Sequence, residues 1–201
     1  MKIRETRILV VWAGLLASLS IRAQAGEKIS RVEYVNTYSE LAMLEMLRVG
    51  IPASIKLAQA CLESDNGNSR LALRANNHFG IKCHDWTGKT VYQDDDARRD
   101  CFRSYPSVYD SYRDHSDFLA GRPRYASLFD LPPDDYRQWA HRLKQAGYAT
   151  LPGYAALLIK IIEENDLHRF DEMVMEGSFD YTVDSASLAP RHSYGTSREI
   201  R

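Results

Sequence analysis

The chain has 201 residues, 26 of them basic and 27 acidic, and a formal net charge of −1. This length suits one domain with a sizeable core, and the composition is ordinary for a globular protein. Residues 26–201 alone carry 22 basic and 26 acidic side chains, and this slightly acidic balance argues against nucleic acid as a partner.

The N-terminus has the pattern of a secretory signal peptide. Three basic residues lie within the first seven positions, an apolar run follows over residues 8–19, and Ala23-Gln24-Ala25 is typical of a cleavage site. The apolar run is too short for a comfortable membrane span. The pattern predicts that residues 1–25 are removed on export, which places the mature protein in the periplasm or outside the cell.

Two helices are predicted next. Apolar residues recur at helical spacing over residues 32–49. Pro52 suits the first turn of a second helix, in which apolar residues fall on an i, i+3, i+7 face that their neighbours widen. We expect this second helix to be buried and to reach solvent only near its end. A short helical piece is expected at residues 69–76.

Two strand-like runs, at residues 90–93 and 101–105, predict a hairpin. Cys83 and Cys101 bracket it, and export permits disulfides, so these two cysteines are expected to pair. Cys61 lies inside the predicted buried helix and is expected to be a free, buried thiol. No CxxC spacing occurs, which argues against a cysteine metal site.

The second half of the chain predicts helices at residues 107–119, 132–146 and 154–165. From residue 171 the periodicity fades and Ser, Gly and Pro accumulate, which predicts a flexible or weakly docked tail over residues 171–201. The chain therefore divides into a signal peptide, a mostly helical domain with one hairpin over residues 30–170, and a tail.

Glu63 stands out because it is a lone carboxylate in the last turn of the buried helix, directly before a run of turn formers. The partial negative charge of a helix C-terminus disfavours a carboxylate, and partial burial adds a desolvation cost, so both effects raise the pKa. A raised pKa suits a general acid, which has to be protonated near neutral pH. A solvated surface glutamate is the alternative interpretation of this stretch alone.

Other residues supply what a glycosidase needs besides an acid. The run Asp94-Asp95-Asp96 at the hairpin tip is a cluster of like charges, in which one carboxyl group could keep a raised pKa. Four aromatic side chains are candidates for the walls of a sugar-binding cleft: Trp86, Tyr125, Tyr148 and Tyr154. Taken singly, the acidic run is typical of a solvated turn, and each aromatic residue is typical of core packing.

Four stretches within residues 51–165 resemble, in order, motifs of the peptidoglycan endo-β-N-acetylglucosaminidases, glycoside hydrolase family 73. Residues 57–64 (LAQACLES) resemble the family's AQ-x-x-x-ES signature, and residues 76–82 (NNHFGIK) resemble its N-x-FGIK stretch. Residues 102–107 (FRSYPS) resemble its FRxYxS strand end, and residues 147–155 (GYATLPGYA) resemble its GYATDPxYA block. Each motif is weak alone, whereas the ordered set is specific.

The resemblance implies an α+β, mostly α, lysozyme-like fold in which an α lobe and a small β-hairpin lobe flank a cleft. It implies an enzyme that cuts the β-1,4 bond after N-acetylglucosamine in peptidoglycan glycan strands, without a cofactor. Glu63 matches the family's catalytic acid, and Tyr148 matches a tyrosine of the catalytic cleft. The expected substrate-binding residues are Asn77, Phe79, Gly80, Ile81, Lys82, Trp86, Tyr125 and Tyr154, of which residues 79–81 match the cleft floor.

Two positions depart from the family pattern. Members often carry a second acidic residue, usually Glu, on the hairpin, where this chain offers only aspartates; Asp95 is the first choice and Asp94 the second. Leu151 stands where the GYATDP block has Asp, which weakens one loop contact and leaves the acid site intact. We expect a monomer that binds peptidoglycan and needs no metal.

Two other functions stay open at this point. A lytic transglycosylase shares the fold type and a single Glu, but it cuts after N-acetylmuramic acid and leaves an anhydro sugar; the GYAT-type block favours the glucosaminidase. A wall-binding domain without turnover would not need Glu63, Tyr148 and the FGIK stretch together. Within the hydrolase, Glu63 as general acid is compatible with a substrate-assisted route and with an inverting route through a second carboxylate.

Overall fold

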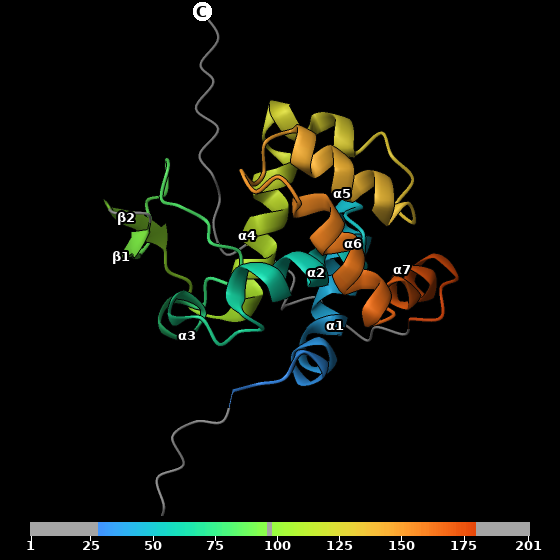
Figure 1. The fold of residues 1–201 in the computed structure, drawn as a ribbon, viewed down its shortest axis with the longest axis horizontal. Helices are drawn as coiled ribbons and strands as arrows, with labels where there is room; N and C mark the ends of the chain where they lie inside the picture. Colours follow the sequence, from blue (N-terminus) through green and yellow to red (C-terminus); the bar gives the residue numbers. More distant parts are fainter. Residues whose placement is uncertain (1–27, 96–97, 180–201) are drawn as a thin grey trace, which may run out of the picture.

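The computed structural model of the chain describes residues 28–95 and 98–179. The predicted signal peptide lies outside these residues. The elements in chain order are α1 (Arg31–Val49), α2 (Ala53–Ser64), α3 (Arg70–Ala75), β1 (Thr90–Asp95), β2 (Arg98–Arg103), α4 (Val108–Ala120), the 3-10 helix η1 (Pro123–Leu128), α5 (Tyr136–Gln145), α6 (Tyr154–Glu164) and α7 (His168–Met175). Figure 1 shows the longer helices gathered around α2, with the β1–β2 hairpin and α3 at one end.

Local sequence signals set the limits of α1. The Ser30 hydroxyl accepts a hydrogen bond from the Glu33 N–H at 3.2 Å, and the Glu33 carboxylate accepts one from the Ser30 N–H at 2.8 Å. This reciprocal capping box satisfies two donors that the first turn would otherwise leave free. Gly50 ends the helix with φ at 84°, a left-handed conformation that glycine adopts without strain.

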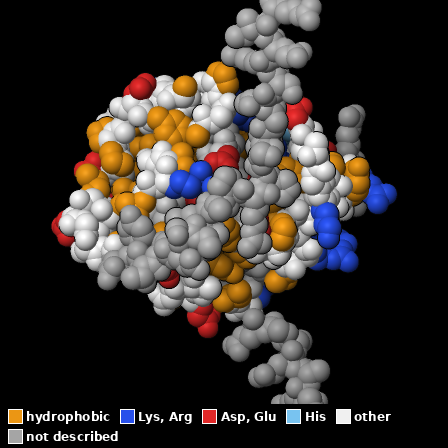
Figure 2. Space-filling view, turned by 180° about the vertical axis from the view of Figure 1, so that it is seen from behind, with side chains coloured by type: hydrophobic (Ala, Val, Ile, Leu, Met, Phe, Trp, Pro, Cys, Tyr) orange, Lys and Arg blue, Asp and Glu red, His pale blue; other side chains and the backbone are white. Residues whose placement is uncertain are grey.

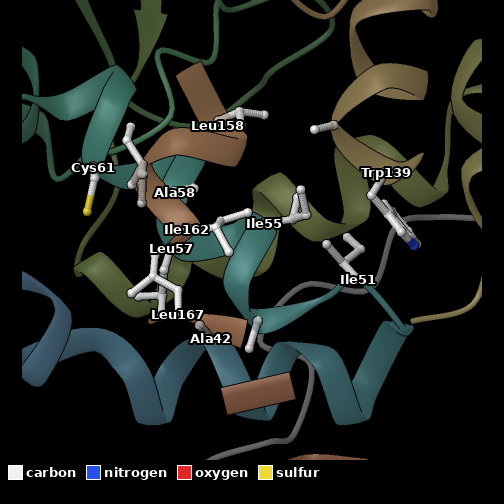
Figure 3. Packing of buried hydrophobic residues seen from close by; sticks show 14 of the residues in the cluster. Ala42, Ile51, Ile55, Leu57, Ala58, Cys61, Trp139, Leu158, Ile162 and Leu167 are labelled. Atoms are coloured by element: carbon white, nitrogen blue, oxygen red, sulfur yellow. The ribbon is translucent and has the colours of Figure 1, made fainter. Parts of the chain in front are cut away.

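The central helix is α2. Its residues from Ala53 to Cys61 are all buried, and α1, α6 and α7 pack around it. Figure 3 shows Leu57 of this helix near Ile162 of α6 and Leu167, with Ala42 of α1 below. The prediction of a buried second helix is confirmed. Because apolar side chains surround α2, each polar group on it needs a partner inside the protein.

The N-terminus of α2 is capped from the far end of the domain. Pro52 precedes the helix and provides no side-chain cap. Asp171 of α7 instead accepts hydrogen bonds from the Ser54 N–H at 2.8 Å and from the Ser54 hydroxyl at 2.5 Å. A carboxylate suits this place because the first turn of a helix has unpaired N–H groups and a partial positive charge. Asp171 therefore ties α7 to α2.

The C-terminal boundary lies further along the chain than predicted. The predicted tail begins at residue 171, yet α7 continues through Met175, and Asp171 is only 1% exposed. The boundary at residue 170 is too early because the bonds to Ser54, together with the packing of Phe170, hold this segment on the helical body. Residues 180–201 lie outside the described part of the chain.

Two smaller differences concern the segment before α6. The stretch between the helices predicted at residues 107–119 and 132–146 contains η1, whose first residue is Pro123. Helix α5 begins at Tyr136 and not at residue 132, because the side chain of Asp135 caps it by accepting from the Gln138 N–H at 3.0 Å. The other predicted helices agree with α1 to α4 and α6 to within two residues at most ends.

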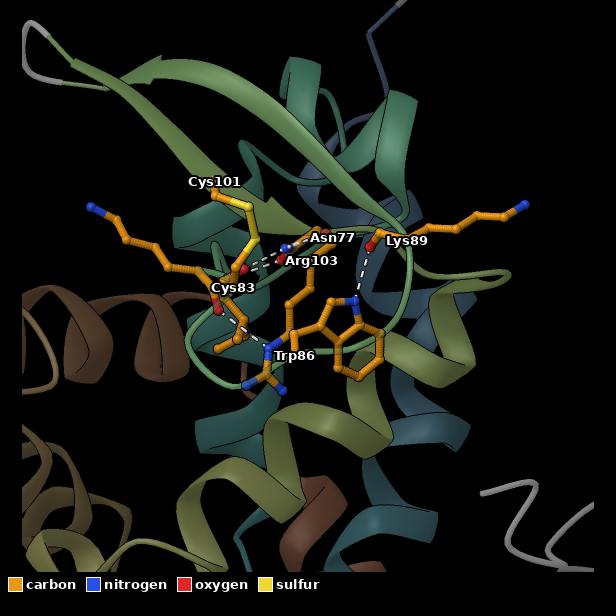
Figure 4. The surroundings of a disulfide bond; sticks show 8 residues. Asn77, Cys83, Trp86, Lys89, Cys101 and Arg103 are labelled. Atoms are coloured by element: carbon orange, nitrogen blue, oxygen red, sulfur yellow. Dashed lines mark hydrogen bonds between the residues drawn. A yellow bond between two sulfur atoms is a disulfide. The ribbon is translucent and has the colours of Figure 1, made fainter. Parts of the chain in front are cut away.

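The β lobe is an antiparallel hairpin in which Tyr92 lies opposite Cys101. Cys101 forms a disulfide with Cys83, so the predicted pairing is confirmed, and Cys61 is free and buried, as predicted. Figure 4 shows the disulfide in the loop region that leads into the hairpin. A small separate core fixes the hairpin on α3; its buried members are Leu71, Ala75 and Phe102.

One largely buried ion pair joins the β lobe to the helices. Arg103 of β2 donates two hydrogen bonds of 2.8 Å to the Asp114 carboxylate of α4, and the Tyr105 hydroxyl donates to the same carboxylate at 2.6 Å. The two charged side chains are 9% and 13% exposed, so solvent screens this bidentate pair only weakly. The Arg103 guanidinium also lies 5.0 Å from the centre of the Trp86 ring (Figure 4). These contacts hold the base of the hairpin against α4.

Several basic side chains are exposed on α3 and the β lobe. Figure 2 shows the opposite face of the molecule, on which Lys and Arg side chains gather at the edge that this lobe forms. These exposed basic residues are Arg70, Arg74, Lys82, Lys89 and Arg99. Within residues 28–95 and 98–179, none of the helices is both long enough and apolar enough to cross a membrane.

Asp171→Ala is expected to lower the free energy of unfolding by about 2 kcal/mol, because Ser54 loses its buried partner and α2 loses its cap. Urea unfolding of the purified protein measures this. Glu172→Ala, in the same helix but exposed, is the control and should change the stability by less than about 0.5 kcal/mol. Equal stability of Asp171→Ala and the wild type would show that α7 does not hold α2.

Candidate active site

Glu63 lies in the last turn of α2, which ends at Ser64. Its side chain is partly buried, and this burial raises the pKa of the carboxyl group to about 6. The sequence predicted a raised pKa from the helix end and from burial, and burial is the main cause. In mildly acidic solution Glu63 can therefore donate a proton.

A hydrogen-bond chain reaches Glu63 from the core. The Tyr154 hydroxyl of α6 donates to Glu63 Oε1 at 3.1 Å, and Gln59 Nε2 donates to the Tyr154 oxygen at 3.1 Å. Gln59 precedes Glu63 by four residues, so the two side chains lie on the same face of α2. The Tyr154 bond favours the ionised form of Glu63 and lowers its pKa, which opposes the effect of burial.

Tyr148 ends a second hydrogen-bond chain beside the first. Its ring stacks on that of Tyr154 with centres 5.7 Å apart, and its hydroxyl lies 3.0 Å from His115 Nε2. The other nitrogen of His115, Nδ1, lies 2.8 Å from Lys56 Nζ. A lysine ammonium only donates, so Nδ1 accepts, and the Nε2–H donates to the Tyr148 oxygen. The Tyr148 hydroxyl proton is then left for another acceptor.

Lys56, which orients His115, is a fully buried amine. Besides His115 Nδ1 it donates to Ser116 Oγ at 2.6 Å and to the Tyr112 carbonyl oxygen at 3.3 Å, so all three of its protons are used. Burial lowers the pKa of Lys56 to about 7, although the nearby Glu45 carboxylate acts in the opposite direction. Burial also holds the pKa of His115 well below its usual range, so the ring is neutral.

Asn77, which was expected to bind substrate, instead holds the loop that follows it. Its side-chain amide donates to the carbonyl oxygens of Ile81 at 3.0 Å and Arg103 at 2.9 Å, and its Oδ1 accepts from the Ile81 N–H at 3.1 Å. Asn77 is buried, and so are Phe79 and Ile81 of the predicted cleft floor. The Phe79 ring stacks on His115 with centres 4.0 Å apart. These residues support the site from within.

Tyr125 continues the aromatic row that begins at Tyr154. Its ring centre lies 6.3 Å from that of Tyr148, which in turn stacks on Tyr154. The three rings come from η1, from the loop before α6 and from α6 itself. Three of the four predicted wall residues thus lie side by side near Glu63, but Tyr125 and Tyr154 are buried and only Tyr148 is partly exposed, so a sugar-binding wall stays a prediction.

The other expected substrate-binding residues belong to the β lobe. Lys82 forms an exposed ion pair with Asp100 at 2.9 Å. Trp86 donates from Nε1 to the Lys89 carbonyl oxygen at 2.9 Å, and its ring is partly exposed. Gly80 has φ at 63°, which a side chain would strain, and it lets the loop turn between the two buried floor residues.

Asp94 and Asp95, the candidates for the second acid, lie at the end of β1 opposite Arg99 and Arg98. Their side chains lie outside the described part of the structure, so the choice between them stays a prediction. Two surface hollows lie elsewhere, one at the start of α5 and one between α3 and the hairpin. Among residues 28–95 and 98–179, no group of His, Cys, Asp and Glu side chains is arranged to hold a metal ion.

Glycoside hydrolases are the class of enzyme that this arrangement fits, because breaking a glycosidic bond needs a carboxyl group that is still protonated near neutral pH. The chain belongs to the glucosaminidase family (mannosyl-glycoprotein endo-β-N-acetylglucosaminidase), whose family model matches residues 39–167. The family membership that the four motifs predicted is therefore confirmed.

Curated relatives include two bacterial enzymes. The chain is 31% identical to exo-glucosaminidase LytG of Bacillus subtilis over 179 residues, which cover 83% of this chain and 62% of that protein. It is 32% identical to peptidoglycan hydrolase FlgJ of Pseudomonas aeruginosa over 145 residues, which cover 66% of this chain and 36% of that protein. The chain thus spans less than two thirds of the length of either relative.

Solved structures support the lysozyme-like fold. A peptidoglycan hydrolase from Sphingomonas sp. A1 superposes with a TM-score of 0.61 at 30% identity, over 72% of this chain and 95% of that chain. The glycoside hydrolase domain of FlgJ from Salmonella typhimurium gives a TM-score of 0.58 at 30% identity, over 80% of this chain and 98% of that chain. Because both comparisons cover nearly all of the other chain, the predicted fold class is confirmed.

Three residues beside the site have no role in the sequence-based prediction: Lys56, Gln59 and His115. Gln59 had a signal, because it falls in the AQ-x-x-x-ES stretch at helical spacing from Glu63. Lys56 also had one, since a lysine inside a predicted buried helix needs an internal partner. His115 gave no local signal, because its partners Lys56 and Tyr148 are distant in sequence.

The stability of the wild type is expected to rise relative to that of Lys56→Met as the pH increases from 7 to 9. The pKa of Lys56 is about 7 in the folded chain and has a reference value of 10.5, so in this window the unfolded chain binds more protons. Raising the pH then favours folding, by up to about 1.4 kcal/mol per pH unit.

Urea unfolding of both proteins at pH 7, 8 and 9 measures this difference. Lys160→Met serves as the control because Lys160 is 66% exposed, and its stability difference from the wild type should stay constant. A constant difference for Lys56→Met as well would show that Lys56 keeps its charge over the whole range.

Proposed function

We propose that the chain is an exported glycoside hydrolase that cleaves the β-1,4 bond after N-acetylglucosamine in peptidoglycan glycan strands, with Glu63 as general acid. The observation that carries this is a partly buried, hydrogen-bonded glutamate with a raised pKa in a member of the glucosaminidase family. The names of the relatives, a glucosaminidase and peptidoglycan hydrolases, favour the wall glycan as substrate. Export is the expectation from residues 1–25.

Glu63 acts first by protonating the glycosidic oxygen, so that the bond breaks with the electron pair on the leaving sugar. The acid becomes a carboxylate in this step. The Tyr154 hydroxyl already donates to Oε1 at 3.1 Å, so the charge that appears on Glu63 meets an oriented donor. Gln59 holds that hydroxyl in place through its bond to the Tyr154 oxygen.

Tyr148 acts on the other side of the breaking bond. Because His115 donates to its oxygen, the Tyr148 hydroxyl proton points away from His115 and can bind a substrate oxygen. The carbonyl oxygen of the 2-acetamido group is the acceptor in a substrate-assisted route, in which that oxygen attacks the anomeric carbon. Water then opens the resulting ring at the same carbon and gives a proton back to Glu63. In an inverting route, Asp95 or Asp94 holds the attacking water instead.

Glu63→Gln is expected to lower the rate of peptidoglycan digestion by about 10²- to 10⁴-fold, because an amide cannot donate the proton that general acid catalysis requires. Digestion of purified peptidoglycan, with the product ends identified by mass spectrometry after borohydride reduction, measures both the rate and the bond that is cut. Glu164→Gln, on the exposed side of α6, is the matched control and should keep the wild-type rate.

Reduced N-acetylglucosamine ends from the wild type are the expected product. Anhydro-muramic ends would place the protein among the lytic transglycosylases, with Glu63 kept as the acid. No product from the wild type, together with retained binding to the polymer, would contradict the hydrolase proposal and leave a wall-binding domain.

The rate should fall as the pH rises through about 6, where Glu63 loses its proton. Tyr154→Phe removes a hydrogen bond that favours the carboxylate, so the pKa of Glu63 increases and this limb of the pH profile of kcat/KM is expected to move to higher pH. Measured pH profiles for the wild type and Tyr154→Phe test this. Tyr136→Phe in α5 is the control, and a limb that stays in place in Tyr154→Phe would show that Tyr154 does not set the pKa.

A further inference from the structure

We propose that Arg122 and Arg124 form a carboxylate-binding site for the peptide stems that peptidoglycan glycan strands carry. This inference rests on the proposed function, and it adds a part of the substrate that Glu63 and the tyrosine row do not contact. The stems are short peptides with several free carboxylates, so they are the anionic part of an otherwise uncharged glycan.

Both guanidinium groups lie over aromatic rings. The Cζ atom of Arg122 is 4.2 Å from the centre of the Phe118 ring, and that of Arg124 is 4.6 Å from the centre of the Tyr125 ring. Arg124 also donates a hydrogen bond to the Tyr125 hydroxyl. An arginine that lies over a ring keeps N–H groups at its edge, in the fork geometry that matches a carboxylate. The stacking therefore orients two donors before any ligand binds.

Their positive charge is not balanced by neighbours in residues 28–95 and 98–179. Arg103 binds the Asp114 carboxylate, whereas no ion pair or carboxylate contact involves Arg122 or Arg124 in this part of the chain. His84, whose ring centre is 6.1 Å from that of Phe118, lies in the field of these arginines. Burial is the largest cause that lowers the pKa of His84, and the positive charges of the nearby arginines lower it further. An anion that binds here meets a positive local potential.

The site continues the aromatic row beside the acid. Glu63 accepts from Tyr154, and ring-to-ring spacings of 5.7 and 6.3 Å lead through Tyr148 to Tyr125, which Arg124 covers. Tyr125 and Tyr154 are buried, so the row is not itself a sugar-binding surface. It connects the hydrogen-bond partner of Glu63 to the two arginines, of which Arg124 covers its far end. Because each second sugar of the strand carries a stem, a stem carboxylate is the anion that reaches them in a productive complex.

The test compares two substrates: peptidoglycan with its stems, and the same glycan after an amidase has removed them and the lactyl carboxylates that this hydrolysis frees have been converted to amides. The ratio of kcat/KM on the two substrates is expected to favour the stem-bearing form for the wild type. In Arg122→Gln/Arg124→Gln this ratio should fall about tenfold or more, as the loss of charge-assisted hydrogen bonds implies. Arg122→Lys/Arg124→Lys keeps the charge but loses the fork of N–H groups. Its kcat/KM ratio should therefore lie between those of the wild type and the Gln variant.

Arg70→Gln/Arg74→Gln is the matched control, because it removes two exposed arginines of α3 and should leave the ratio unchanged. An equal fall in this control would show general attraction to an anionic polymer and would overturn the site. An unchanged ratio in Arg122→Gln/Arg124→Gln would overturn it as well. A fall that disappears once hydrofluoric acid has removed phosphate polymers from the wall would assign the arginines to phosphate and not to the stems.

A binding measurement tests this proposal independently of the proposed hydrolysis. Glu63→Gln protein and a stem-bearing disaccharide are mixed, and the dissociation constant is measured by calorimetry with and without the two arginines. A loss of affinity of about tenfold or more supports the arginine site even if no glycan is cut. Equal affinities, with folded protein shown by circular dichroism, would contradict it.

Discussion

The burial of α2 is the constraint on which the rest of the structure depends. A helix enclosed by α1, α6 and α7 cannot expose polar side chains to water except at its end, so each polar group along it has to find a partner on a neighbouring element. Ser54 finds Asp171, Lys56 finds His115, and Gln59 finds Tyr154. The order of these partners along α2 fixes how α7, α4 and α6 lie around it.

The same requirement for internal partners also positions the candidate catalytic residues. Glu63 stands where α2 leaves the core, so it is dry enough for a raised pKa and open enough to contact a ligand. The partners of Gln59 and Lys56 lead directly to Tyr154 and, through His115, to Tyr148. Hydrogen bonds that satisfy a buried helix thus also orient the two tyrosine hydroxyls. Under the proposed function, stability and catalysis share these side chains, which is why the supporting groups lie so close to Glu63.

Much of this arrangement was predictable from the sequence, and the limit is set by sequence distance. Helical periodicity and caps are local, so α1, α2 and the hairpin were predicted. The helix end made Glu63 a candidate, and the family motifs, which are also local, matched it to the catalytic acid. The boundary at residue 170 was wrong because the buried role of Asp171 depends on Ser54, 117 positions away. The Lys56–His115 contact spans 59 positions. No local pattern marks such pairs, since burial alone brings them together.

Two opposed effects meet on Glu63, and its proposed role as general acid needs both. Burial favours the protonated form, which has to be present before the glycosidic bond breaks, and Tyr154 favours the ionised form, which is what remains afterwards. Burial alone would give an acid that holds its proton too tightly, and an exposed carboxylate would lose it well below neutral pH. A pKa of about 6 is the compromise. It follows from one helix end that is only partly covered and one hydroxyl that Gln59 keeps aimed at it.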